Sequence, residues 1–186
     1  MTFRARLTAV LLTAISAAVP AAASGAAAAV VDAKAEIAAG RKEYMEGEFR
    51  KAAAHFAAAT RLRPEDAGAF YWAGIAYERM ADIATPFGGR LLGRARGYLR
   101  SAARLAPESR EYRQALFDFL LDSSDSSRSA LPEAAALLET VAASDPDRDA
   151  MCRRLAEQRK ANSSAEARLG RMLLLAPRGA ARMAGQ

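Results

Sequence analysis

The segment GGRLLGRARG, residues 88–97, comes close to a phosphate-binding loop. It has Gly88, four further residues and Gly93, after which the nucleotide-binding motif requires lysine and then serine or threonine. This chain has Arg94 and Ala95 at those two positions. Because the lysine that reaches the terminal phosphates and the hydroxyl that binds magnesium are both missing, we interpret the segment as a glycine-rich connection and not as a nucleotide site.

Residues that bind metals or act as nucleophiles are few in this chain. It has one histidine, His55, and one cysteine, Cys152, far apart in the sequence. Neither a zinc cluster nor a Ser-His-Asp triad can be built from them, so we expect no metal and no cofactor. We expect His55 to lie on an exposed or half-buried helix face and Cys152 to be a small buried residue. A single cysteine also excludes a disulfide within the chain.

Glu108 and Ser109 form the one dipeptide that suggests catalysis by a carboxyl group. Cell-wall lytic transglycosylases, some of which carry helical repeats, have a catalytic glutamate followed by serine. The sequence around this dipeptide does not match that family. We therefore predict that the chain is not an enzyme.

The N-terminus has the pattern of an export signal. Arg4 and Arg6 precede the apolar run LTAVLLTAISAAV, which is followed by Pro20 and three alanines. This order of charge, apolar run and small residues is typical of a cleaved secretory signal. The alternative is an uncleaved anchor, since no charged residue lies between Arg6 and Asp32.

The signal predicts how the chain is divided. We expect a signal peptide over residues 1–23, a linker over residues 24–31 and a mature protein that is periplasmic or secreted from a bacterium. The formal net charge of +6 is concentrated in residues 147–186. Basic charge can indicate nucleic-acid binding, but export argues against that partner.

The composition and the spacing of prolines indicate repeated helices. Apolar residues make up 52% of the chain but aromatic residues only 7%, a balance typical of helices packed through alanine. Helical segments of similar texture end at four prolines, in TRLRP, ARLAP, ASDP and LLLAP. The first unit, residues 33–66, matches a known repeat at Gly40, Tyr44, Gly47, Phe49, Ala52, Phe56, Ala59 and Pro64. The next unit has Phe70, Tyr71, Ala73, Gly74 and Tyr77 at the corresponding places.

These two units resemble the tetratricopeptide repeat. The resemblance implies an all-α fold, a right-handed superhelical stack of about four antiparallel helix pairs over residues 32–177. We expect the polar residues 178–186 to form a flexible tail. Such pairs are stable because each neighbour buries the open apolar face of the last. The later units are longer, and their additions at residues 81–89 and 124–128 fall in the turns within a pair.

The later helices can be placed from their periodicity and end signals. We expect a second helix over residues 90–105, a third pair at residues 109–121 and 131–143, and a fourth pair at residues 147–161 and 165–175. Pro132 fits the first turn of its helix. Ser163 and Glu166 have the spacing of a capping box that would begin the last helix.

The first helices of tetratricopeptide repeats line a concave groove that holds peptide segments. The resemblance therefore implies partner-binding residues at Arg41, Tyr44, Tyr71, Glu78, Arg79 and Gln114. Further positions on the same helices are Lys34, Ile37, Met45, Ile75, Asp118 and Leu121. The carboxylate clamp of some family members is not matched, because Ile37, Arg41 and Trp72 replace residues that it requires. A mixed groove of aromatic residues and arginines suits a peptide or an acidic helix instead.

A row of arginines offers a second surface. It lies in the helix expected over residues 90–105, with no acidic residue between Asp82 and Glu108. The row is either a solvated helix face or a contact for an anionic surface through Arg90, Arg94, Arg100 and Arg104.

Two functions follow from these surfaces. We expect an exported adaptor or scaffold that binds a peptide segment of another protein of the cell envelope in its concave face. The alternative is a module that binds the cell wall or anionic lipid at the membrane surface through the arginine row, or a fragment of a cell-wall enzyme.

Overall fold

The computed structural model describes residues 21–84, 88–125 and 127–175, and within these residues the chain is helical, with no strand. The N-terminal residues 1–20 and the tail expected over residues 178–186 lie outside this range. The described helices are α1 (Ala21–Met45), α2 (Phe49–Leu62), α3 (Ala67–Ile83), α4 (Gly89–Leu105), α5 (Arg110–Asp122), α6 (Ala130–Glu139) and α7 (Arg148–Leu175). The all-α prediction is therefore confirmed.

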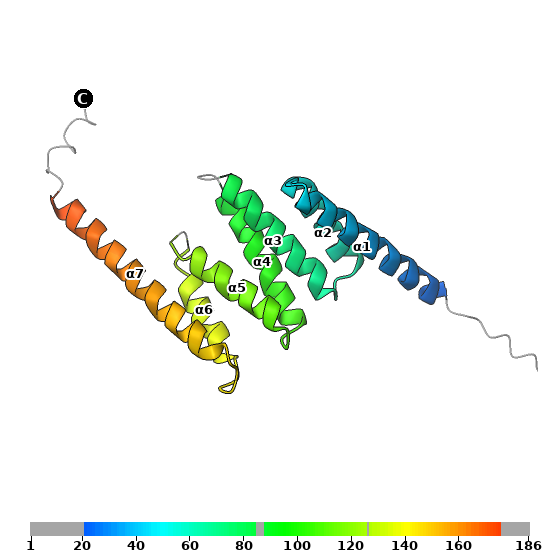
Figure 1. The fold of residues 1–186 in the computed structure, drawn as a ribbon. Helices are drawn as coiled ribbons and strands as arrows, with labels where there is room; N and C mark the ends of the chain where they lie inside the picture. The colour runs from blue at the N-terminus through cyan, green and yellow to red at the C-terminus, as the bar shows by residue number, and fades with distance from the viewer. Residues whose placement is uncertain (1–20, 85–87, 126, 176–186) are drawn as a thin grey trace, which may run out of the picture.

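The helices lie side by side in chain order (Figure 1). Helices α2, α4 and α6 each run back along the helix before them, and each also contacts the helix that follows. Helices α1, α3, α5 and α7 run in the same direction in Figure 1. We call α1, α3 and α5 the first helices, because each begins a pair.

Short-range signals set the ends of these helices. Gly47 has a φ of 80° in the turn between α1 and α2, a conformation that glycine adopts at little cost. Asp66 caps α3 by accepting a hydrogen bond from the amide of Ala69 at 3.1 Å. Ser109 caps α5 in the same way, accepting from the amide of Tyr112 at 3.4 Å. Local sequence therefore explains where the chain reverses.

Glycines let the two helices of a pair approach closely. A Cβ placed on Gly40 would lie 2.7 Å from the ring of Phe56, which is fully buried. A Cβ on Gly74 would lie 2.7 Å from the side chain of Leu99, also fully buried. Both contacts are shorter than carbon atoms tolerate, so alanine at either position would push a pair apart.

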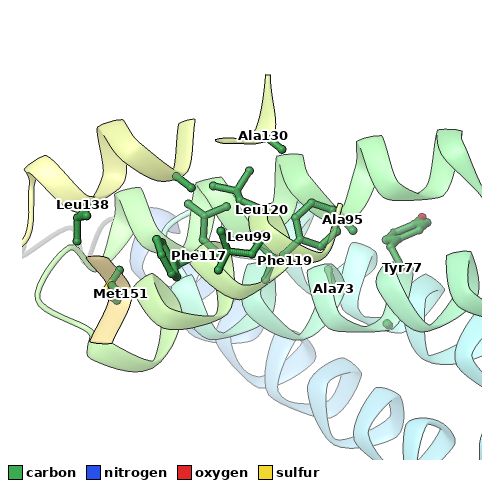
Figure 2. Close-up of a cluster of buried hydrophobic side chains, with 14 of the residues drawn as sticks. Ala73, Tyr77, Ala95, Leu99, Phe117, Phe119, Leu120, Ala130, Leu138 and Met151 are labelled. Carbon is green, nitrogen blue, oxygen red and sulfur yellow. The ribbon is translucent and has the colours of Figure 1, made fainter. Parts of the chain in front are cut away.

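One apolar core runs through the stack. Leu99 of α4 and Phe117, Phe119 and Leu120 of α5 meet at its centre (Figure 2). Met151 of α7 is 2% exposed and closes the core at the C-terminal end. The core is continuous because each pair covers the apolar face of the previous one.

The prediction of a fourth helix pair is wrong. Helix α7 is unbroken from Arg148 to Leu175, so the described residues form three pairs and one single helix. The hydroxyls of Ser163 and Ser164 donate to the carbonyl of Lys160, at 3.0 and 2.8 Å, and Ser163 does not cap a helix. Serine is tolerated inside a helix when it bonds in this way, and residues 148–169 contain no glycine or proline to stop the helix.

Other expectations need smaller corrections. Helix α6 ends at Glu139, earlier than the expected residue 143. Residues 24–31, expected to be a linker, lie in α1. Cys152 is exposed, not buried. It follows Met151, which faces the core, and successive helical residues point about 100° apart. Among the described residues, no helix is paired with α7, so none of them covers Cys152 on its other side.

The two lengthened turns differ in the contacts that their residues make. Helix α3 continues to Ile83, so it absorbs the first residues of the expected turn over residues 81–89. Gly88 lies against the backbone of α3, where a Cβ would be 2.6 Å from the carbonyl oxygen of Ala81. In the second turn, Ser127 and Ser129 accept hydrogen bonds from Arg96 of α4, at 3.2 and 2.8 Å. Described residues at both turns, Gly88 at the first and Ser127 and Ser129 at the second, therefore contact a neighbouring helix.

Candidate functional site

Aromatic side chains connect the three first helices across one face. The guanidinium of Arg41 in α1 lies 4.8 Å from the ring centre of Trp72 in α3. The rings of Tyr71 in α3 and Tyr112 in α5 lie 5.1 Å apart. We call this surface the first-helix face. It comprises Arg41, Tyr44, Tyr71, Trp72, Ile75, Glu78, Arg79, Tyr112, Gln114 and Asp118.

Tyr44 has a structural role on this face. Its ring makes edge contacts with Phe49 and Trp72, at 5.1 and 5.8 Å between ring centres, and it is half-buried. Tyr44 therefore fills the space between the first pair and α3. Its hydroxyl is hydrogen-bonded to Arg79, and this bond raises the pKa of the Arg79 guanidinium.

Tyr71 is the central aromatic residue of the face. It is half-buried and contacts Trp72 at 5.6 Å and Tyr112 at 5.1 Å between ring centres. Burial, followed by the nearby carboxylate of Glu111, raises the pKa of its phenol. The phenol is therefore neutral at physiological pH and offers a hydrogen-bonding group next to an aromatic surface.

Two residues of this face were not predicted as binding residues. Trp72 stacks on the buried ring of Phe56, with 5.8 Å between ring centres, and also supports Arg41. Tyr112 is half-buried beside Tyr71. Tyr112 lies in the first turn of α5, and Tyr71 lies near the start of α3. This similar placement is the sequence signal that could have identified Tyr112.

Several carboxylates lie toward the C-terminal ends of α3 and α5. Burial raises the pKa of Glu78, and the carboxylates of Asp82, Asp122 and Asp118 raise it further, against the opposing effect of Arg79. Gln114 donates a hydrogen bond to Asp118 at 2.8 Å. Glu78, Arg79 and Gln114 are thus part of one polar region. This region is mainly acidic, which we did not predict from the sequence.

A shallow cavity of about 490 Å³ lies where α1 and α3 end. We call it the end cavity. It is lined by Tyr44, Met45, Gly47, Phe49, Arg79, Asp82 and Ile83. The side chains of Met45 and Ile83 are 85% and 73% exposed, which is unusual for large apolar residues.

The arginine row is mostly occupied by contacts within the chain. Arg94 donates to the hydroxyl of Tyr77 at 3.2 Å and lies 5.5 Å from the centre of its ring. Arg96 and Arg100 both bind the carboxylate of Glu133 in α6, the latter at 2.8 Å. Arg90 and Arg104 are exposed. The row therefore offers less free charge than its sequence suggests.

The ion pairs also explain the titration of Glu133. Burial by itself would raise the pKa of its carboxyl group, but the hydrogen bonds from Arg100 and Arg96 outweigh burial and lower it. The pairing connects α4 to α6. A structural role for Arg96 and Arg100 follows.

The described residues contain no group of side chains that could hold a metal ion. His55 is half-buried, as expected, and its Nδ1 lies 2.7 Å from a carboxylate oxygen of Glu36 in α1. None of the described helices is both long and apolar enough to span a membrane.

No protein-family profile matches this chain, and no curated protein matches it in sequence.

Proposed function

We propose that the chain is an exported adaptor of the tetratricopeptide type that holds a peptide segment of another cell-envelope protein on the first-helix face. In this proposal the three helix pairs belong to a right-handed superhelical stack whose concave side is that face. The chain acts by binding and not by catalysis. The observation that carries the proposal is the half-exposed row of Arg41, Trp72, Tyr71 and Tyr112, which extends over all three first helices.

Physical reasons support this surface as a binding site. Tyrosine, tryptophan and arginine dominate the energetics of protein interfaces, because they combine a large apolar area with hydrogen-bonding groups. The conformation of Tyr71 is already restricted here, since its ring is packed between those of Trp72 and Tyr112. Little conformational entropy would therefore be lost when a partner binds.

Photo-crosslinking in the producing cell tests the location of the site. A benzophenone amino acid replaces Arg79 on the first-helix face or, as the control, Arg61, which is exposed on α2. A discrete adduct should form from position 79 and not from position 61. Mass spectrometry then identifies the partner. Equal adducts from both positions would mean that this face has no special role.

The double variant Arg41→Ala, Tyr71→Ala tests the contribution of the aromatic part of the face to affinity. Binding of the identified partner should weaken by more than about 2 kcal/mol, or roughly 30-fold, while the melting temperature changes little. A large loss of stability would assign these residues a structural role. If affinity and stability are both unchanged, the exposed Arg90 and Arg104 become the better candidates, and Arg90→Ala, Arg104→Ala is the matched variant.

Export has its own test. The proposal expects the mature chain to begin near Ser24 and to be recovered outside the cytoplasm. N-terminal sequencing of the protein from fractionated cells measures this. Recovery of the chain with Met1 in the membrane pellet would contradict it.

A further inference from the structure

The end cavity adjoins the first-helix face at Tyr44 and Arg79, and apolar surface is left uncovered in it. In the described part of the chain, four large apolar side chains are exposed, and Met45 and Ile83 are the two most exposed of them. Both line the same cavity, beside the rings of Tyr44 and Phe49. An apolar side chain of a partner placed here would remove Met45 and Ile83 from water, at about 25 cal/mol for each Å² buried.

The charge beside this cavity is mainly negative. Asp82 lines the cavity, and Glu78 lies one helical turn before it on the same side of α3. Asp118 and Asp122 have the same spacing on α5, and all three aspartates act on Glu78 through their charge. Helices α3 and α5 meet at the rings of Tyr71 and Tyr112, so the four carboxylates form a strip across two neighbouring first helices, and Asp82 lies at the cavity.

The nearby cations pair with only part of this strip. Arg79 is 3.6 Å from Asp82. Arg154 of α7 pairs with Asp118. Arg41 lies over Trp72. In the described part of the chain, no salt bridge joins Glu78 or Asp122.

We propose that the segment held on the first-helix face is cationic: an apolar side chain enters the end cavity, and two or more adjacent lysines or arginines lie over Glu78, Asp82, Asp118 and Asp122. This inference rests on the proposed function and specifies its partner. The apolar residue provides the anchor. The basic residues relieve the repulsion among the carboxylates, guide association and select against acidic segments.

Synthetic peptides test the partner's chemistry directly. The probe is a fluorescent 12-residue peptide with two leucines followed by four alternating lysines and arginines. One comparison peptide has glutamate in place of each basic residue, and another has serine in place of each leucine. Fluorescence anisotropy measures binding to the full chain at 50 mM salt. The probe should bind at least tenfold more tightly than either comparison peptide. Its affinity should fall as salt is raised to 300 mM.

Matched protein variants locate the site. Glu78→Gln with Asp122→Asn, and separately Met45→Ser with Ile83→Ser, should each weaken binding of the probe about tenfold. The control is Val31→Ser with Leu62→Ser, which changes the other two exposed apolar residues and should leave affinity unchanged. Equal binding of basic and acidic peptides, absence of binding, or equal losses in the control would overturn the inference.

Two further outcomes separate this inference from the proposed function. If crosslinking at position 79 captures a partner through an acidic segment, the adaptor function stands and the cationic preference is wrong. If the protein alone self-associates in sedimentation velocity and Met45→Ser, Ile83→Ser abolishes the association, the occupant of the cavity is a second copy of the chain. That result would also overturn the inference.

Discussion

Replacing Gly74 by alanine should disrupt the contact between α3 and α4. A Cβ at this position would lie 2.7 Å from Cγ and Cδ2 of Leu99 and 3.2 Å from its backbone nitrogen. Leu99 is fully buried, so its side chain cannot move out into solvent without disturbing its neighbours. The helices must separate or Leu99 must leave its preferred rotamer, and such overpacking costs about 1–3 kcal/mol.

A matched control isolates that steric cost. Gly97 is also inside a helix, α4, but a Cβ there would have no neighbour within 4 Å. Both changes gain about 1 kcal/mol of helix propensity, so Gly97→Ala should stabilise the protein by that amount. The free energy of unfolding of Gly74→Ala should therefore be about 1–3 kcal/mol lower than that of Gly97→Ala.

Urea unfolding followed by circular dichroism at 222 nm measures both variants. In thermal unfolding, the same difference corresponds to roughly 2–4 °C for each kcal/mol in a chain of this size. If Gly74→Ala stabilises the protein as much as Gly97→Ala does, α3 and α4 do not approach as closely as described, and the packing argument for the glycines fails.

Three further predictions concern single side chains. Burial and the charge of Asp82 raise the pKa of Glu78 in the folded protein. Protonated Glu78 therefore stabilises the fold at pH values below its pKa in the unfolded chain. This stabilisation is lost as the pH rises through the pKa of Glu78 in the folded protein. Glu78→Gln should therefore stabilise the protein at pH 7 by about 0.2–0.5 kcal/mol and by little at pH 3, measured by urea unfolding. The pKa of Glu133 is lowered in the folded protein. Ionised Glu133 therefore stabilises the fold at pH values above its pKa in the unfolded chain, and this stabilisation is lost as the pH falls through its pKa in the folded protein. Glu133→Gln should cost about 1 kcal/mol at pH 7, and its urea midpoint should converge with wild type at pH 3. Cys152 should react fully with a maleimide reagent without denaturant, by intact-mass measurement, whereas slow labelling would show that α7 is covered.

Local sequence was sufficient for much of the helix layout. Gly47, Asp66 and Ser109 act at the turn or cap where they stand, through interactions with residues only a few positions away. Gly40 and Gly74 also lie where the resemblance implied a close approach. Such features can be read from sequence because their partners are near in the chain or at a fixed offset in the next helix.

The end of the stack could not be read in this way. The serines around Ser163 can cap a new helix or bond back to the preceding turn, and the sequence is compatible with both. The structure has the second arrangement, with α7 packed through Met151 and Leu155 and no helix returning along it in the described residues. The exposure of Cys152 depends on that missing neighbour.

The sequence by itself determined that the described residues are helical and where the first three helix pairs begin, since periodicity, caps and turns act over short distances. Only the tertiary structure decided which charged and apolar groups remain available. Glu133 reaches Arg96 and Arg100 from another pair, and Asp118 reaches the surroundings of Glu78 from another first helix. Electrostatic interactions depend on distances in space, which a sequence of charges does not contain. The arginine row was therefore overestimated as a free surface, and the acidic strip beside the end cavity was missed.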